Sequence, residues 1–278
     1  MDNDIDSLTF AQEIARPSGP GLARAALLFA REVAYSDLRP SSYLARIAGW
    51  AEAAAARCPR WDSAQVRASR LAQLLFDEFA LRGNQEDYHD PRNSYLNEVI
   101  DRRLGLPISL SAIFLEVAAS IDLPAEGVGL PGHFIVAVRG ESRRTFLDPF
   151  HGGVQLNMDD LHELVHDVTG YAGSIRPEWL APVSTDAILA RMLLNLQSVF
   201  VEKEEWSRAL AVVEHLRVLH PRAAEHVRDL GLLHYRLGSL RLAATCLQEY
   251  LARSPEAADA GQVRKMLNDL LVQLARLN

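Results

Sequence analysis

The first third of the chain alternates apolar and polar positions at the spacing of amphipathic helices. Apolar side chains recur every three or four positions in three segments, at 22–34, 41–58 and 63–80. The last segment ends at the run Arg82-Gly83-Asn84, which interrupts the pattern. Residues 1–20 precede these segments, are acidic and lead into RPSGPG, so the sequence predicts a flexible acidic tail ahead of a helical region.

The pattern changes twice in the middle of the chain. Two further helical segments, 93–104 and 107–121, are separated by Gly105 as a C-terminal stop, and Pro107 suits the first turn of the second. Beyond them the apolar period falls from 3.6 to 2 in GVGL, FIVAV and TFLD, which predicts short strands. Helices that lead into a small antiparallel sheet define an α+β domain, which we assign to residues 21–182.

The last third is helical again, and one of its segments repeats. SRALAVVEHLRVLHP at 207–221 aligns with RLAATCLQEYLARSP at 241–255, a shift of 34 residues. Matching positions carry similar residues: Ala209 and Ala243, Val213 and Leu247, Leu216 and Tyr250, Pro221 and Pro255, and, on the preceding helices, Leu196 and Leu230. This period resembles that of tetratricopeptide repeats, which stack helix pairs into a binding surface. We expect an all-α repeat domain at 183–278, with 260–277 as its capping helix; an unrelated helical bundle is the alternative.

Composition narrows the classes of protein that fit these elements. The chain has 278 residues, of which 49% are hydrophobic and 23% charged, as in an ordinary soluble protein with a sizeable core. A net charge of −7 disfavours a nucleic-acid partner. The acidic start MDNDIDS does not have the pattern of a signal peptide, and the most apolar runs are too short or too charged for a bilayer. We therefore expect a cytoplasmic protein without a membrane partner.

Cysteine usage gives no sign of a metal centre or of a disulfide. Cys58 and Cys246 lie far apart in helical contexts, and we interpret both as small buried hydrophobic residues. No paired cysteine and histidine spacing indicates a structural zinc site. We expect no cofactor.

The predicted hairpin at 129–153, GLPGHFIVAVRGESRRTFLDPFHGG, carries the strongest candidate chemistry. His133 begins its first strand and Asp148 ends its second. A turn centred on Gly140 and Glu141 would place the two directly opposite each other, with Ile135 and Phe146 on the same face. A carboxylate in that position fixes the tautomer of the imidazole and stabilises its protonated form. The alternative is a structural histidine beside a turn-forming aspartate.

A third catalytic member has to be sought at the start of the helix that Pro107 opens. Backbone N–H groups and the positive end of the helix dipole suit a developing oxyanion there. Ser109 and Ser111 lie in or near this first turn. Either could instead hydrogen-bond the end of its own helix, which is the commoner role of serine at such a position.

The order of these elements resembles the transglutaminase-like core of the papain-type cysteine-protease clan. GNQEDYHDPRNSYLNEVIDRRLGLPISLSAIFLEVA, GVGLPGHFIVAV and FLDPFHGG are more closely similar to the bacterial SirB-type family, in which this core carries tetratricopeptide repeats. The resemblance runs from about residue 25 to the C-terminus. It implies a transglutaminase-like fold with His133 and Asp148 at the triad histidine and aspartate positions. Pro107 falls on the family's nucleophile position, and Cys58 lies in no matching motif.

Three functional hypotheses follow, and the first is the leading one. Because proline supplies no nucleophile, the chain is expected to be a non-catalytic or atypical member that binds a protein or peptide partner through residues 183–278. The alternative is a Ser-His-Asp hydrolase or acyltransferase acting on amide or ester bonds, with Ser109, His133 and Asp148 as its triad. The third is a divalent-metal site formed by His133, Asp148 and His151, for which the sequence offers no recognised ligand spacing.

Overall fold

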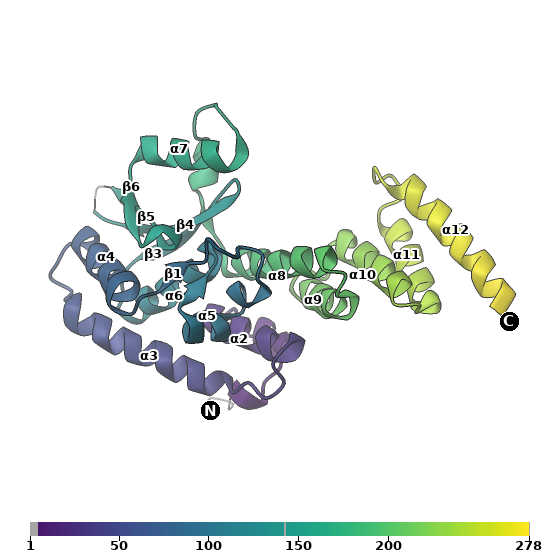
Figure 1. The fold of residues 1–278 in the computed structure, drawn as a ribbon, viewed down its shortest axis with the longest axis horizontal. Coiled ribbons are helices and arrows are strands. Elements are labelled where there is room, and N and C mark those ends of the chain that lie inside the picture. The colour runs from purple at the N-terminus through teal and green to yellow at the C-terminus, as the bar shows by residue number, and fades with distance from the viewer. Residues whose placement is uncertain (1–4, 142, 278) are drawn as a thin grey trace. The chain divides into compact units, whose positions relative to one another are not determined.

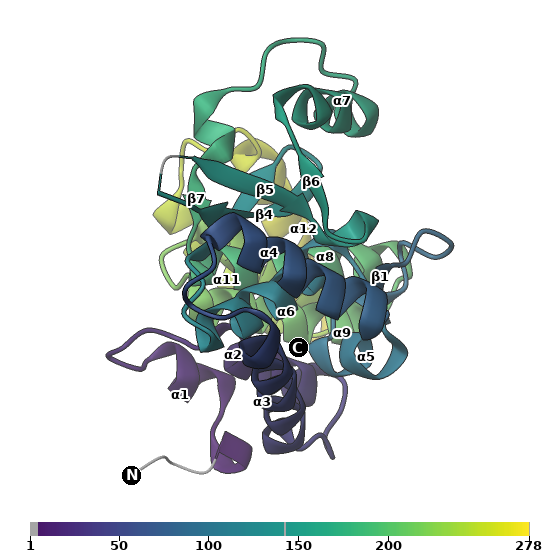
Figure 2. The same cartoon turned by 90° about the vertical axis from the view of Figure 1, so that its left-hand side faces the viewer.

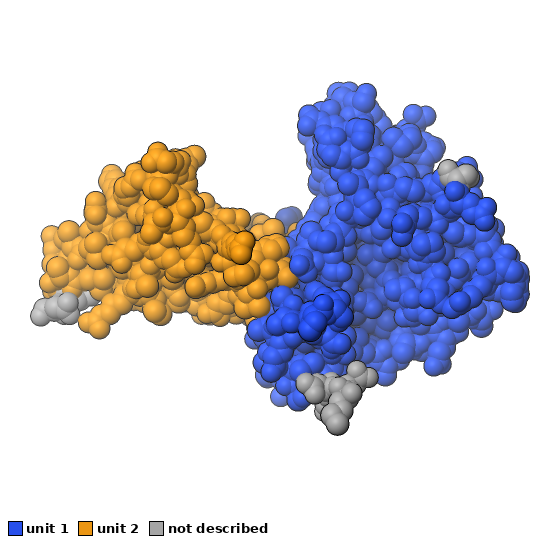
Figure 3. All heavy atoms as spheres, turned by 180° about the vertical axis from the view of Figure 1, so that it is seen from behind, with its two compact units in different colours: residues 1–192 blue, residues 193–278 orange. Residues whose placement is uncertain are grey.

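The computed structural model describes residues 5–141 and 143–277, and the chain divides into two compact units, shown in different colours in Figure 3. The first comprises residues 1–192 and the second residues 193–278. The sequence suggested a boundary after residue 182. The division between the units falls ten residues later, within helix α8 (Thr185–Glu202), which supplies residues to both units. Across the described residues, every helix is too short or too polar to serve as a bilayer span.

Helices are the main elements of the first unit. Besides α8 they are α1 (Phe10–Ile14), α2 (Leu22–Val33), α3 (Pro40–Arg57), α4 (Ala64–Ala72), α5 (Leu96–Arg102), α6 (Pro107–Ser120) and α7 (Met158–Thr169). The apolar stripe of α2 is buried completely at Leu27, Leu28 and Phe29, which makes this helix the core of the N-terminal half. The helix expected at 63–80 is α4 followed by a π-helical segment, Gln73–Glu78.

The sequence predicted a flexible tail at 1–20, of which residues 1–4 lie outside the described part of the chain. Residues 5–20 are not loose: they form a short 3₁₀ turn (Ile5–Ser7) and α1, which packs on α2. Ile5, Leu8 and Phe10 are buried. The fully buried Glu13 carboxylate accepts hydrogen bonds from the backbone of Gly21 and from the side chain of Arg24. Burial of these apolar residues outweighs the acidic composition that suggested a tail.

Five short strands form an antiparallel sheet in the order β6-β5-β4-β3-β7. Their bounds are β3 (Ala125–Leu130), β4 (His133–Arg139), β5 (Arg144–Asp148), β6 (Val154–Leu156) and β7 (Pro182–Val183). α6 packs against β3 and β4 on one side of the sheet, and α7 lies on the other side (Figures 1 and 2). Two further strands, β1 (Arg82–Gly83) and β2 (Leu104–Gly105), pair in parallel. The predicted α+β architecture is confirmed.

Alternation along the strands separates the two sides of the sheet. Side chains from β3 and β4 form a buried cluster with Leu161 and Val165 of α7; they are Val128, Leu130, Ile135 and Ala137. Phe146 of β5 packs against the same cluster. The prediction that Ile135 and Phe146 share one face is therefore confirmed, and the cluster anchors the hairpin that carries His133 and Asp148.

The second unit is an array of helix pairs. After α8 come α9 (Trp206–Leu219), α10 (Ala224–Arg236), α11 (Leu240–Arg253) and α12 (Ala260–Leu277). The bounds of α9 and α11 differ by 34 residues at both ends, as the sequence repeat requires. Corresponding positions are buried in both copies, for example Ala209 and Ala243, which are both fully buried. The array has the helix order of tetratricopeptide repeats.

We expect His226 on α10 to make the stability of this unit depend on pH. Its ring is buried beside His220, and among the described residues its Nδ1 has no hydrogen-bond partner. Burial lowers the pKa of His226 below 6.5, and Glu225 and Asp229 offset part of that shift. Because the unfolded state takes up the proton first, the free energy of unfolding should fall as pH drops below about 6.5, by up to ~1.4 kcal/mol per pH unit.

Urea unfolding of the wild type and of His226→Leu between pH 8 and pH 5 measures this dependence. The variant should lose less stability than the wild type between pH 6.5 and the lower pKa of the folded state. Equal slopes in the two proteins would show that His226 does not cause the effect.

Candidate functional site

His133 is placed by a tight turn at the start of β4. Leu130 pairs with His133 across the β3–β4 hairpin, and Pro131 and Gly132 are its two turn residues. Gly132 has a φ of +72°, which a glycine after proline supplies in a type II turn. A Cβ at Gly132 would clash with Val168 of α7, so the turn also packs too closely for a side chain. The His133 side chain is 5% exposed.

Asp148 is fixed at the end of β5 by the turn that follows it. Pro149 opens a 3₁₀ turn, η4 (Pro149–His151), and the Asp148 side chain caps it by accepting from the backbone N–H of Phe150 at 2.9 Å. The backbone N–H of Gly153 donates to the Asp148 carbonyl at 2.7 Å. The carboxylate is 1% exposed. The backbone N–H of Phe150 holds its Oδ1, and the side chains that contact Oδ2 hold the other oxygen.

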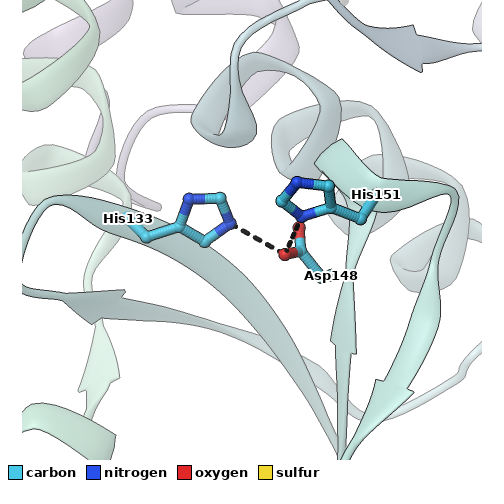
Figure 4. Close-up of side chains that lie close together, drawn as sticks. All are labelled: His133, Asp148 and His151. Carbon is cyan, nitrogen blue, oxygen red and sulfur yellow. Dashed lines mark hydrogen bonds and ion pairs between the residues drawn. The ribbon is translucent and has the colours of Figure 1, made fainter. Parts of the chain in front are cut away.

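Two histidines share one carboxylate oxygen at this site. His133 Nε2 lies 3.0 Å from Asp148 Oδ2, and His151 Nδ1 lies 2.7 Å from the same oxygen (Figure 4). The two imidazole rings are stacked, with centroids 5.9 Å apart. Burial would raise the pKa of Asp148, but the hydrogen bonds and charges of His133 and His151 together hold it below its ordinary value. The carboxylate is therefore the ionised centre of the group.

The register of the β4–β5 pairing that brings His133 close to Asp148 differs from the predicted register. Arg139 pairs with Arg144, so the β4–β5 turn lies one residue later than a turn centred on Gly140 and Glu141. His133 consequently does not stand directly opposite Asp148 in the ladder. The register differs by two residues, which keeps every side chain on its expected face, and the two side chains still meet.

A cavity of about 560 Å³ opens beside His151. The segment Arg82–Glu86 lines one side of it, and Phe150, His151 and Gly152 line the other. The ring of Phe150 meets His133 edge-on at 6.1 Å and Tyr88 at 5.9 Å. The group is thus buried at His133 and Asp148 but accessible at His151, whose side chain is 42% exposed.

The Ser109 hydroxyl is hydrogen-bonded to backbone groups and not to His133. Its Oγ accepts from the Leu106 backbone N–H at 2.9 Å and donates to the Asn93 carbonyl at 2.7 Å, and the residue is fully buried. Ser111 donates to the Pro107 carbonyl at 2.7 Å. Pro107 is the first residue of α6, as predicted. The structure therefore brings His133, Asp148 and His151 together, while both serines bind backbone at the start of α6.

Ser109→Ala should destabilise the protein. The change removes the buried hydroxyl that joins the Leu106 N–H to the Asn93 carbonyl and leaves these two groups only their longer direct hydrogen bond of 3.3 Å, which costs about 1 kcal/mol in the free energy of unfolding. Ser120→Ala is the matched control, because the Ser120 hydroxyl bonds the Glu116 carbonyl at the exposed end of the same helix. Chemical denaturation that finds the two variants equally stable would contradict a structural role for Ser109.

Neither cysteine offers an activated thiol. Cys58 and Cys246 are both buried, as the sequence suggested. Burial raises the pKa of each thiol, which reduces the thiolate fraction that a nucleophile needs.

Two residues near the site were not anticipated from the sequence. Arg191 of α8 donates to the His133 carbonyl at 2.9 Å and lies over the ring of Phe134. Burial lowers the pKa of Arg191, and the nearby Tyr88 offsets part of that shift. Arg191 lies 58 residues from His133 in the chain, and no local pattern links them. Tyr88 falls in the stretch EDYHDPRN, where the family resemblance was the one available signal.

Comparison with known families assigns both parts of the chain. Residues 41–194 match the model of the transglutaminase-like superfamily, and residues 196–268 match a tetratricopeptide repeat model. The fold and the His133–Asp148 pair thus belong to a transglutaminase-like core that is followed by helical repeats.

Curated relatives narrow the assignment further. A UPF0162 protein of Xylella fastidiosa (strain Temecula1 / ATCC 700964) is 35% identical over 252 residues, which cover 90% of this chain and 89% of that protein. A UPF0162 protein of Vibrio cholerae is 26% identical over 210 residues, which cover 74% of this chain and 76% of that protein. F-box only protein 21 of Mus musculus is 31% identical over 135 residues, 45% of this chain but 20% of that protein. The chain belongs to the UPF0162 family of transglutaminase-like proteins.

Proposed function

We propose that the protein is an interaction module that binds a helix or peptide of a protein partner through its helical repeats. The observation that carries the proposal is a groove of about 490 Å³ within the second unit. Residues of α8, α10 and α12 line it, together with Trp206 at the start of α9. In stacked helix pairs a groove of this kind is the usual binding surface.

The chemistry of the groove suits an apolar side chain flanked by polar groups. Val201 and Leu232 are 41% and 36% exposed, so the groove presents aliphatic surface to solvent. The Arg236 guanidinium lies 5.2 Å from the Trp206 ring centroid, and Asp229 accepts from Gln197 at 3.1 Å. Asp229 is also paired with Arg228, so the Arg236 guanidinium is the charge that would orient a partner around an apolar anchor.

The transglutaminase-like core would then act without the family's covalent chemistry. Support comes from Pro107 at the expected nucleophile position and from the raised pKa of both buried thiols. The closer SirB-type resemblance and the cytoplasmic location stay predictions of the sequence.

A matched pair of substitutions tests the proposal by affinity capture with the full chain as bait. Leu232→Asp places a charge in the groove, whereas Leu271→Asp makes the same change at an exposed leucine of α12 outside the groove. A partner retained by the wild type and by Leu271→Asp should be lost with Leu232→Asp. Retention by all three proteins would contradict binding in the groove.

The Ser-His-Asp hydrolase remains the second candidate, because the His133–Asp148 contact is the orienting half of such a triad. The backbone partners of the Ser109 hydroxyl count against it. A fluorophosphonate reacts with activated serines, and we expect it to leave the protein unlabelled. Labelling that disappears in Ser109→Ala would favour the hydrolase over the non-catalytic module.

A further inference from the structure

We propose that His133, Asp148 and His151 bind one divalent transition-metal ion, with Zn²⁺ as the ion that best matches the donors. This goes beyond the proposed partner binding and does not depend on it. The nearest ligand atoms of the three residues all lie within 4.8 Å of one another. Two imidazole nitrogens and one carboxylate oxygen form a common three-residue set for zinc, with further positions left to water or another ligand.

Hydrogen bonds already orient the Asp148 carboxylate and hold the backbone of His133. Asp148 Oδ1 is already held by the backbone N–H of Phe150, so Oδ2 is the oxygen turned toward both imidazoles (Figure 4). A ligating carboxylate that is oriented by a second hydrogen bond is a regular feature of protein metal sites. His133 is held at its backbone by the turn that ends at Gly132 and by Arg191.

The distances within the group can be compared with those that an ion requires. Both ring nitrogens converge on Asp148 Oδ2, at 3.0 and 2.7 Å, because Oδ1 accepts from the Phe150 N–H. Ligands of a tetrahedral zinc with bonds of ~2.0–2.1 Å are separated by roughly 3.3 Å. The two hydrogen-bonded distances to Asp148 are shorter than that value and would lengthen as the ion replaced the shared protons, while the separation of up to 4.8 Å within the group would narrow, which the partly exposed His151 allows.

An ion has a path to the site and room for its remaining ligands. His151 lines the cavity of about 560 Å³, so open coordination positions would be reached from that side. The donors also exclude other ions: imidazole is a poor ligand for Mg²⁺ and Ca²⁺, which prefer sets of oxygen ligands. Zn²⁺, Co²⁺ and Ni²⁺ are the class that such a site takes.

Titration of tag-free, chelator-dialysed full-length protein with Co²⁺ and Zn²⁺ tests the proposal, by visible absorption and by calorimetry. The wild type should bind one ion per chain. His151→Ala and Asp148→Asn should each weaken that binding at least about 100-fold, because each removes one of three ligands. His162→Ala is the matched control, since it removes a histidine of α7 outside the group and should bind as the wild type does.

Several outcomes would overturn the proposal. One is a wild type that binds neither ion. Another is equal affinity in the wild type, His151→Ala and Asp148→Asn, which would place any bound ion elsewhere. Circular dichroism and thermal unfolding establish that each variant is folded. If Asp148→Asn fails to fold, the partly exposed His151 still permits the test.

Discussion

Asp148→Ala should lower the free energy of unfolding by about 3 kcal/mol in metal-free buffer. The Asp148 carboxylate is 1% exposed and accepts from His133, from His151 and from the Phe150 backbone N–H. Removing it leaves the buried His133 ring and a backbone N–H without their acceptor, and it removes the cap of η4. Unfolding in urea, followed by circular dichroism at pH 7.5, measures the change.

A matched substitution separates this effect from the loss of any aspartate. Asp167→Ala removes an exposed carboxylate from α7 and should change the free energy of unfolding by less than about 0.5 kcal/mol. Asp148→Asn should lie between the two, because an amide oxygen can still accept from the Phe150 N–H. If Asp148→Ala were as stable as Asp167→Ala, the three-residue group would not be an organising element of the core.

Gly231→Val should destabilise the helical repeats by about 3 kcal/mol. α10 and α11 cross so closely at Gly231 that a Cβ there would lie 2.7 Å from Leu247 Cδ2 and 2.8 Å from Leu247 Cγ. A branched side chain requires the fully buried Leu247 side chain or the two helices to shift. Differential scanning calorimetry should show a lower unfolding temperature for the variant.

The control for this substitution is the same change at an open helical glycine. A Cβ at Gly261 of α12 has no atom within 4 Å, so Gly261→Val should leave the unfolding temperature unchanged or raise it slightly. The close crossing is then responsible for the difference between the variants. Equal unfolding temperatures for the two variants would contradict the tight packing of the repeat.

Local signals were enough to predict the pair at the centre of the site. Pro131 and Gly132 specify the turn before His133, and Pro149 specifies the one after Asp148, so both residues stand at strand ends whatever the exact register. The turn between the strands was predicted less well. Its residues include no asparagine–glycine or aspartate–glycine pair, which would have fixed its length.

Other features depend on packing between distant segments, which periodicity does not encode. Arg191 reaches the His133 carbonyl from α8, and the burial of Phe10 against Phe29 orders a segment whose composition suggested a tail. From the sequence, His151 was a candidate only as a ligand of the divalent-metal site, the hypothesis with the least support. Its approach to Asp148 depends on the tight turn of η4, where Gly152 has a φ of +76°.

The repeat shows the opposite case, in which the sequence predicts packing well. A shift of 34 residues specified both the helix bounds and the buried positions, because each helix pair contacts mainly its neighbours. Gln197 stands where the second copy has Gly231, and it lines the groove. There Gln197 is bonded to Asp229.

The most direct test of partner binding is site-specific photo-crosslinking with the full-length protein in cells. A photoreactive amino acid at position 232 would report contacts in the groove, and the same residue at position 271 would report contacts on the exposed side of α12. We predict a discrete crosslinked protein from position 232 that is absent from position 271. No adduct from position 232, or the same adducts from both positions, would contradict the account.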